Sequence, residues 1–154
     1  MNNPGRGLVL GGKTGLLGQA LVSVLANENW TVFAPGREEL DIFNSEEIAS
    51  FVEKKKITHI FNTVAYTRVD QAEEEKELAF QLNRRLPTLL GNVARKKDIY
   101  LVHYSTDFVF DGKKNTPYTP QDKTNPLSVY GKSKLEGENS LLDKTWNKLL
   151  IIRT

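Results

Sequence analysis

Short apolar runs alternate along this chain with stretches whose apolar residues recur three or four positions apart. The apolar runs predict five strands, at Leu8–Leu10, Trp30–Ala34, Thr58–Val64, Ile99–Tyr104 and Lys148–Ile152. The stretches between them have the spacing of one face of a helix. They predict helices over about residues 15–27, 45–56, 78–93 and 129–142.

Two residues and one segment indicate where these elements begin, break or end. Ser45 precedes the second helical pattern, so we expect it to cap that helix. Pro87 interrupts the third pattern and predicts a kink or a fresh helix start there. The segment 111–127 is rich in proline, glycine, asparagine and aspartate, and is expected to be a loop.

Strictly alternating strands and helices predict an α/β fold with a doubly wound parallel sheet. We detect no linker or internal repeat, so one domain is expected over residues 1–154. In such sheets ligands bind outside the carboxyl ends of the strands. The residues that follow each strand are therefore the first candidates for a site.

Two glycine motifs overlap after the first strand. Gly12, Gly15 and Gly18 form a G-x-x-G-x-x-G pattern typical of a dinucleotide-binding turn, in which the pyrophosphate lies at a helix N-terminus. Gly7 and Gly12-Lys13-Thr14 also match the P-loop pattern, but the variable positions between them are the strand itself. The dinucleotide interpretation is favoured, and a glycine-rich turn without a ligand is the alternative.

The end of the second strand bears on the choice of dinucleotide. NAD-selective folds usually carry an acidic residue there, which binds the ribose 2′-hydroxyl. Here Arg37 follows 19 residues after Gly18 and could pair with a 2′-phosphate, which favours NADP. A solvated loop arginine is the alternative. Asp41 and Ile42 follow a short turn and could flank the adenine.

A candidate catalytic set follows the fourth strand. Tyr130 and Lys134 stand four residues apart on a predicted helix and so share one face. A nearby ammonium would lower the pKa of the phenol, which could then donate a proton to a developing alkoxide. Ser105 and Thr106 end the strand, where a hydroxyl can bind a substrate carbonyl. A surface Tyr–Lys contact and a turn-forming Ser-Thr-Asp cluster are the alternatives.

Composition narrows the class of protein. The chain has 154 residues, no cysteine, and 21 basic against 19 acidic side chains, a net charge of 21 − 19 = +2. The absence of cysteine excludes a disulfide scaffold and cysteine-ligated metals. Two histidines without clustered carboxylates predict no metal site, and the small net charge predicts no nucleic-acid partner. No targeting signal or membrane span is found, so a cytoplasmic protein is expected.

Four segments resemble extended short-chain dehydrogenases/reductases, and in particular the dTDP-4-dehydrorhamnose reductase family. They are Gly12–Gly18, Ala65–Glu73, Val102–Gly112 and Pro126–Glu138. The second and third are much more specific to that family than the Tyr-x-x-x-Lys pair. The resemblance implies a Rossmann-type NAD(P)-binding domain and reduction of a nucleotide-linked 4-keto-6-deoxy sugar to dTDP-L-rhamnose by NADPH or NADH.

The resemblance also assigns roles to residues. The catalytic residues it implies are Thr106, Tyr130 and Lys134. The cofactor-binding residues are Gly12, Lys13, Thr14, Gly15, Leu16, Leu17, Gly18, Arg37, Asp41, Ile42, Thr63, Val64, Ala65, Tyr130 and Lys134. The substrate-binding residues are Thr67, Val69, Thr106, Asp107, Phe108 and Tyr130. Asn83 matches an asparagine common in that helix of the family, with a structural capping role equally compatible.

Two departures from the family bear on function. Phe108 replaces the usual tyrosine, which removes a hydroxyl near the substrate. The family also carries a C-terminal substrate-binding region, so we expect this chain to be truncated before it. A nucleotide sugar is the expected partner, and a homodimer is compatible with the family. The rival hypotheses are a dinucleotide-binding regulatory subunit of the same fold and another nucleotide-sugar epimerase, dehydratase or reductase.

Overall fold

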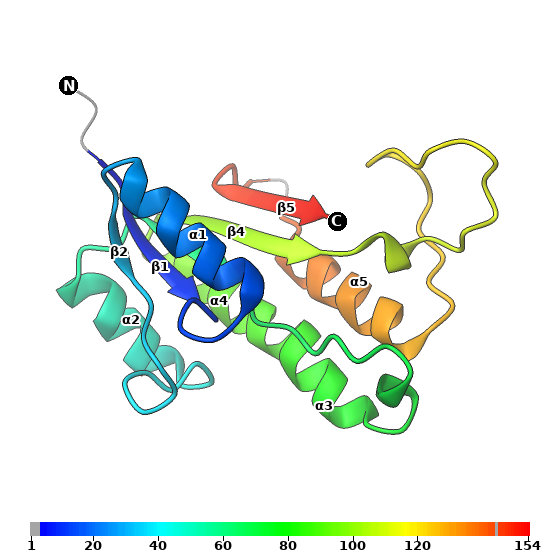
Figure 1. Ribbon diagram of the computed structural model, residues 1–154, viewed down its shortest axis with the longest axis horizontal. Helices are drawn as coiled ribbons and strands as arrows, with labels where there is room; N and C mark the ends of the chain where they lie inside the picture. Colours follow the sequence, from blue (N-terminus) through cyan, green and yellow to red (C-terminus); the bar gives the residue numbers. More distant parts are fainter. Residues whose placement is uncertain (1–3, 144) are drawn as a thin grey trace.

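A computed structural model describes residues 4–143 and 145–154, which fold around a five-stranded parallel sheet (Figure 1). The strands are β1 (Arg6–Leu10), β2 (Thr31–Phe33), β3 (His59–Asn62), β4 (Tyr100–Ser105) and β5 (Leu149–Arg153). They lie in the order β2-β1-β3-β4-β5, with all four neighbouring pairs parallel. The predicted α/β class and parallel sheet are confirmed.

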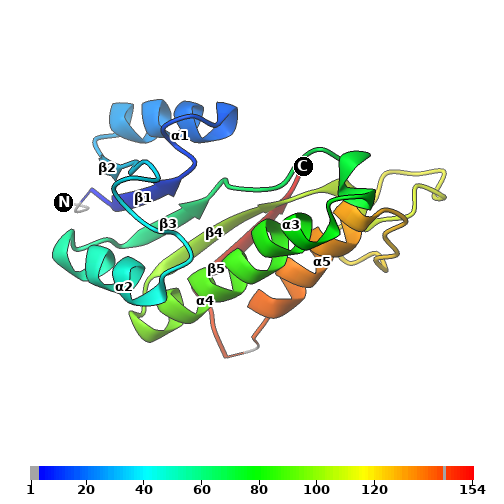
Figure 2. The same ribbon diagram turned by 90° about the horizontal axis from the view of Figure 1, so that it is seen from below.

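Helices cover both faces of this sheet. They are α1 (Leu16–Asn27), α2 (Ser45–Lys54), α3 (Lys76–Phe80), α4 (Leu86–Lys96) and α5 (Val129–Leu141). Figure 2 shows α1 on one face and α2, α4 and α5 on the other. Within the described ranges, no helix combines the length and apolarity needed to cross a bilayer.

The strand order creates a switch point between β1 and β3. From β1 the chain passes through α1 to β2 at one edge, and from β2 it crosses back over β1 through α2 to reach β3. The loops that leave β1 and β3 therefore turn to opposite faces of the sheet. A crevice opens where such loops diverge, at the carboxyl ends of the strands.

Alternating side chains of the strands divide the core into two layers. Leu8 and Leu10 point to the layer beneath α2, α4 and α5, where they pack with residues such as Ile60 and Leu90. Val9, between them in sequence, belongs to the smaller layer beneath α1. Because both faces of the central strands are buried, apolar side chains dominate them, although β3 and β4 also bury the polar residues Asn62, His103 and Ser105.

Several element boundaries differ from the sequence expectation. Asn44, rather than Ser45, caps α2: its Oδ1 accepts hydrogen bonds of 3.1 Å from the backbone N–H groups of Glu46 and Glu47. The predicted Ser45 cap is wrong because Ser45 already lies inside the helix. The second and third strands are shorter than their apolar runs: the ladder of β2 ends at Phe33, opposite Leu8, and that of β3 ends at Asn62, opposite Leu10.

The third helical stretch has a break, as Pro87 indicates. The chain runs from α3 through a π-helical turn (Gln81–Arg85) into α4, with Pro87 in the first turn of α4. A proline is tolerated there because the first turn of a helix needs no N–H at that position. The prediction of a fresh helix start is confirmed.

Candidate active site

The loop after β1 is tight because two glycines leave no room for a side chain. Gly11 has a positive φ of 84°, and a Cβ on it would lie 2.6 Å from Oγ1 of Thr63. That hydroxyl donates a 2.7 Å hydrogen bond to the carbonyl of Leu10, which joins the loops after β1 and β3. A Cβ on Gly18 would overlap the carbonyl oxygen of Gly11. Sequence reasoning selected Gly18 and missed Gly11, whose left-handed backbone only the structure reveals.

The start of α1 has the features of a phosphate-binding helix N-terminus. Gly15 is the N-cap and supplies no side-chain hydrogen bond to the first turn. Leu16 is 92% exposed, so the first turn faces solvent at the carboxyl edge of the sheet. The N–H groups of a first helical turn have no partner inside the helix, and together with the helix dipole they favour an anion. A dinucleotide pyrophosphate fits this open end.

Thr106 lies directly after β4 and begins a short 3₁₀ turn (Asp107–Val109). Its Oγ1 accepts a 3.2 Å hydrogen bond from the backbone N–H of Phe108 and donates one of 3.2 Å to the carboxylate of Asp107. Thr106 is only 5% exposed. The hydroxyl is therefore held in place at the carboxyl end of the strand.

Tyr130 lies in the first turn of α5, and its ring contacts that of Phe108. The two ring centroids are 5.5 Å apart in an edge-to-face arrangement. Burial raises the pKa of the Tyr130 phenol, an effect that the neighbouring Thr106 hydroxyl opposes and the Asp107 carboxylate supports. The sequence analysis expected Lys134 to lower this pKa. The structure shows the opposite direction, so at neutral pH the phenol keeps its proton.

Lys134 explains that difference, because its ammonium is directed to the strand rather than to the phenol. Nζ donates a 2.5 Å hydrogen bond to the carbonyl of Tyr104, and the residue is 2% exposed. Burial lowers the pKa of Lys134 to about 8, although the Glu138 carboxylate one turn later raises it. An amine with this pKa can gain or lose a proton close to physiological pH.

The lowered pKa predicts how Lys134 affects stability. In the unfolded chain the amine keeps its proton up to about pH 10.5, whereas the folded chain releases it above about pH 8. Between these values the unfolded state binds more protons, so the contribution of Lys134 to the unfolding free energy rises with pH. The nearby His103 has a pKa of about 3 and does not titrate in this window.

We therefore expect the unfolding free energy of wild type minus that of Lys134→Met to increase from pH 7.5 to pH 10. Urea unfolding at several pH values measures this difference. Lys132→Met, at an exposed position on the same helix, is the matched control and should give a flat difference. A wild-type minus Lys134→Met difference that falls with pH would contradict the burial of the amine.

Asn83 joins the loop after β3 to α5. Asn83 lies in the π-helical turn and is fully buried. Its Oδ1 accepts a 2.9 Å hydrogen bond from the N–H of Tyr66, and its Nδ2 donates a 3.1 Å hydrogen bond to the carbonyl of Tyr66. The same Nδ2 donates to Oγ of Ser133 at 2.9 Å. Asn83 thus fixes α5, which carries Tyr130 and Lys134, against the β3 loop. The structure shows a bridging role where the sequence left a capping role open.

The substrate-side candidates lie around Tyr130. Val69 packs against the buried cluster that contains Tyr130 and Tyr66, while Thr67 is exposed on the same loop. Phe108 is 46% exposed and contributes to a cavity of about 340 Å³. The cavity is lined by Asp107, Phe108, Phe110, Asp111, Gly112, Tyr118, Leu127 and Ser128. The aromatic and apolar lining beyond Phe108 was not selected from sequence, because it comes from a loop without periodic pattern.

Other predicted residues lie apart from the Tyr130 group. Val64 is partly buried against the main core, and Ala65 follows it in the loop after β3. Arg37 lies in the loop after β2. The carboxylate of Asp41 accepts from the N–H of Phe43 at 2.9 Å, and Ile42 packs against the main core. The Asp41 side chain is exposed and can accept further hydrogen bonds, whereas the Ile42 side chain is partly covered by the core.

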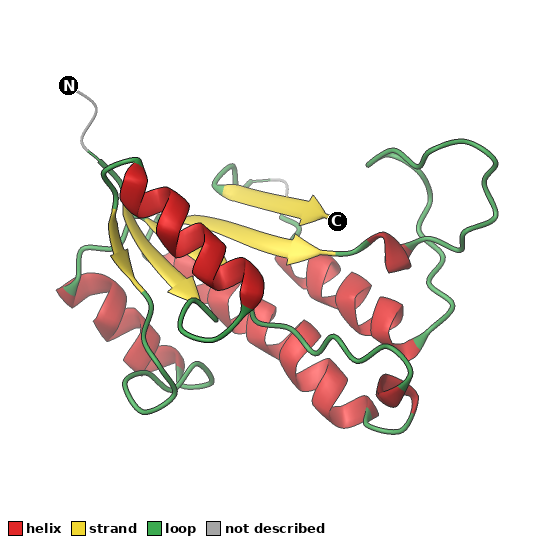
Figure 3. Ribbon diagram, in the orientation of Figure 1, coloured by secondary structure: helices red, strands yellow, loops and turns green. Residues whose placement is uncertain are grey.

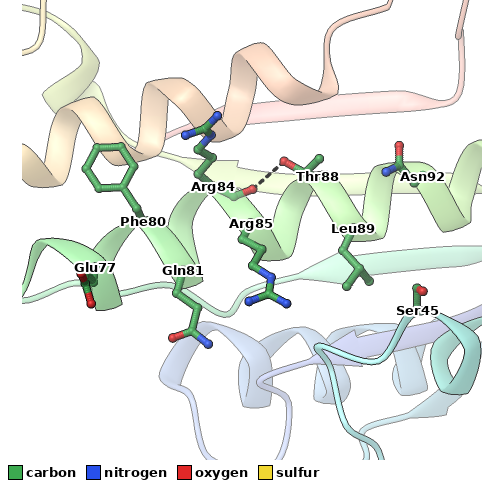
Figure 4. A pocket seen from close by; sticks show the side chains of 9 residues that line it. All are labelled: Ser45, Glu77, Phe80, Gln81, Arg84, Arg85, Thr88, Leu89 and Asn92. Carbon is green, nitrogen blue, oxygen red and sulfur yellow. Dashed lines mark hydrogen bonds between the residues drawn. The ribbon is translucent and has the colours of Figure 1, made fainter.

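A larger hollow, of about 910 Å³, lies elsewhere (Figure 4). It follows the outer side of α3 and α4, where Leu89 points toward Ser45 at the start of α2 and Gln81 and Arg85 project to the same side of the helix. None of the candidate catalytic residues lines it. In the described part of the chain, no three potential metal ligands of the His, Cys, Asp or Glu type gather there or elsewhere.

Known proteins share this sequence and fold. A family model described as RmlD substrate binding domain matches residues 6–154. The dTDP-4-dehydrorhamnose reductase of Aggregatibacter actinomycetemcomitans is 41% identical over 148 residues, which cover 96% of this chain and 50% of that protein.

Two solved structures extend the comparison. A dTDP-4-dehydrorhamnose reductase from Clostridium acetobutylicum superposes with a TM-score of 0.87 at 38% identity, covering 96% of this chain and 52% of that one. The reductase of Bacillus anthracis, solved in complex with NADP, gives a TM-score of 0.89 at 30% identity, covering 98% and 53%. The chain thus spans about half the length of the relatives it matches. With the family model matched over residues 6–154, the chain belongs to the RmlD substrate binding domain family, and the three relatives named above are dTDP-4-dehydrorhamnose reductases.

Proposed function

We propose that the protein uses NADPH or NADH, with NADPH favoured, to reduce the C4 keto group of a dTDP-linked 4-keto-6-deoxy sugar, as dTDP-4-dehydrorhamnose to dTDP-L-rhamnose. The observation that carries the proposal is the position of Tyr130. It stands with Thr106 and Lys134 at the carboxyl edge of the sheet, the edge where the open start of α1 offers a phosphate site. The names of the relatives support the same chemistry.

The residues of this chain supply the proton and its environment. A bound nicotinamide dinucleotide would supply the hydride for C4. The Tyr130 phenol, which its raised pKa keeps protonated, donates the proton to the C4 oxygen. The Thr106 hydroxyl exchanges its bond to the Asp107 carboxylate for one to the same oxygen and so stabilises its developing charge. After turnover, the phenolate regains its proton from solvent, while Lys134 holds the carbonyl of Tyr104 at the end of β4.

The proposed cofactor site combines the loops after β1, β2 and β3 with α5. Its members are Gly12, Lys13, Thr14, Gly15, Leu16, Leu17, Gly18, Arg37, Asp41, Ile42, Thr63, Val64, Ala65, Tyr130 and Lys134. Two observations support cofactor binding here: the tight glycine turn after β1, and the start of α1, which has no side-chain cap. Asp41 offers an exposed carboxylate beside this site, and Ile42 offers a partly buried apolar side chain.

On the substrate side, the proposed residues are Thr67, Val69, Thr106, Asp107, Phe108 and Tyr130. Phe108 supplies an apolar surface next to the reacting phenol, which suits the C6 methyl group of a 6-deoxy sugar better than a hydroxymethyl group. Residues 1–154 form the dinucleotide-binding domain in this proposal. Since the relatives are about twice as long, a further region is expected to complete the sugar site. Such an enzyme would work in the cytoplasm, and a homodimer is compatible with it.

The decisive test is turnover with a defined sugar. Purified full-length protein is mixed with NADPH and dTDP-4-keto-6-deoxy-sugar, and the loss of reduced nicotinamide absorbance is followed together with the product by mass spectrometry. We expect consumption of one NADPH per product that is heavier by two hydrogen atoms. NADPH binding without turnover of any nucleotide sugar would instead support the regulatory-subunit alternative. Robust reduction by residues 1–154 alone would contradict the need for a further region.

A further inference from the structure

Ion pairs join the loops that follow β1 and β2. Nζ of Lys13, in the glycine loop, lies 2.5 Å from Oε1 of Glu38 and 3.2 Å from Oε2 of Glu39. The same Oε2 of Glu39 accepts a 2.7 Å hydrogen bond from the backbone N–H of Gly36. One cation of the first loop is thus held by two carboxylates of the second.

Gly36, beside these ion pairs, lies where the cofactor preference of a dinucleotide fold is usually set. In dinucleotide folds selective for NAD, an acidic residue near the end of the second strand binds the ribose 2′-hydroxyl. Here the short loop after β2 has Gly36 in that region. A Cβ built on Gly36 would lie 2.8 Å from Nζ of Lys13 and 2.5 Å from Oε1 of Glu38. The space that a side chain would fill at this position is therefore occupied by the Glu38 carboxylate together with the Lys13 ammonium that it binds.

Charge and exposure make this ammonium available to an anion. The hydrogen bond to Glu38 raises the pKa of Lys13, so the side chain is a full cation at neutral pH. The Lys13 side chain is 51% exposed, and those of Glu38 and Glu39 are 68% and 55% exposed. Exposed ion pairs contribute little free energy, so a doubly charged phosphate can displace the carboxylates.

We propose that Lys13 recognises the 2′-phosphate of NADP, and that Glu38 and Glu39 compete with this phosphate for the ammonium. The inference rests on the proposed function and names what sets its cofactor preference. It moves the 2′-phosphate contact from Arg37, which the sequence favoured, to the glycine loop. It also predicts a moderate preference for NADP over NAD, because the phosphate must replace two existing partners.

The test compares ADP-ribose with 2′-phospho-ADP-ribose by titration calorimetry, with no sugar present. In wild type we expect the 2′-phosphorylated ligand to bind more tightly. Lys13→Met should lower this preference about tenfold, the loss of one charge-assisted contact. Glu38→Gln combined with Glu39→Gln should raise it by a similar factor. The measured quantity is the ratio of the two affinities in each variant, so a change that weakens both ligands equally cancels.

Arg37→Met is the matched control, since it removes the other cation near the end of β2. The proposal is overturned if Arg37→Met abolishes the preference while Lys13→Met keeps it, or if wild type binds both ligands equally. Circular dichroism checks that each variant is folded. Wild-type protein that binds neither ligand would overturn both the inference and the proposed function. Binding with a preference that survives Lys13→Met would overturn the inference alone.

Discussion

Tyr130→Phe is expected to lower kcat for sugar reduction by about 10²- to 10⁴-fold, the usual contribution of a general acid. The substitution removes the phenolic hydroxyl, so no group of this side chain can protonate the C4 oxygen. The affinity for NADPH should change by less than about threefold, because in the proposed site the loops after β1 and β2 make most of the dinucleotide contacts. Stopped-flow kinetics gives kcat, and fluorescence titration gives the affinity.

The structure indicates that this substitution keeps the fold. The Tyr130 ring packs edge-to-face on Phe108 and lies in the cluster around Tyr66 and Val129, and phenylalanine retains both contacts. Tyr100→Phe is the matched control, because Tyr100 is 46% exposed and stacks on His59 away from the reacting groups. Its kcat should equal that of wild type.

A Tyr130→Phe variant that keeps more than about a tenth of wild-type kcat would remove Tyr130 from the proton-transfer step. The proton would then have to come from another group. A variant that loses NADPH affinity as well as kcat would assign Tyr130 to binding instead. The two readouts together thus separate chemistry from positioning.

The architecture was predictable because it rests on local pattern. Apolar runs such as Leu8–Leu10 are buried on both faces, and helical spacing marks α1, α2, α4 and α5. The strand order was not predictable in the same way. It depends on how α2 crosses from β2 to β3, and local sequence patterns fix the hand of such crossings but not the number of strands passed.

In the candidate site, too, local features could be predicted from the sequence and long-range contacts could not. Sequence placed Thr106, Tyr130 and Lys134 at one edge, since motif order and strand ends are sequence properties. It could not foresee that Lys134 donates to the carbonyl of Tyr104, because that contact joins α5 to β4 across 30 positions. Likewise, Pro87 predicted a break in the helix but not its type. The π-helical turn accompanies hydrogen bonds from Asn83 to Tyr66 and Ser133, which lie far away in the sequence.

Gly137→Ala is expected to destabilise the protein by about 2–3 kcal/mol, the cost of overpacking a tight contact. Gly137, in α5, lies against the π-helical turn, and a Cβ built on it would overlap the backbone carbonyl oxygen of Asn83 and lie 3.5 Å from Pro87. A backbone oxygen cannot rotate away as a flexible side chain can. The two elements would have to separate, and the bonds from Asn83 to Tyr66 and Ser133 would weaken.

The sign of this effect is informative, because helix propensity alone predicts the opposite. In an exposed helix, glycine to alanine stabilises by about 1 kcal/mol, so any net loss measures the contact with Asn83. Urea unfolding gives the change, with Asn139→Ala, at an exposed position of α5, as the control that should stay within about 0.5 kcal/mol of wild type. A Gly137→Ala variant as stable as the control would show that α5 does not pack this closely on the π-helical turn. It would also mean that Asn83 is not what fixes the helix that carries Tyr130 and Lys134.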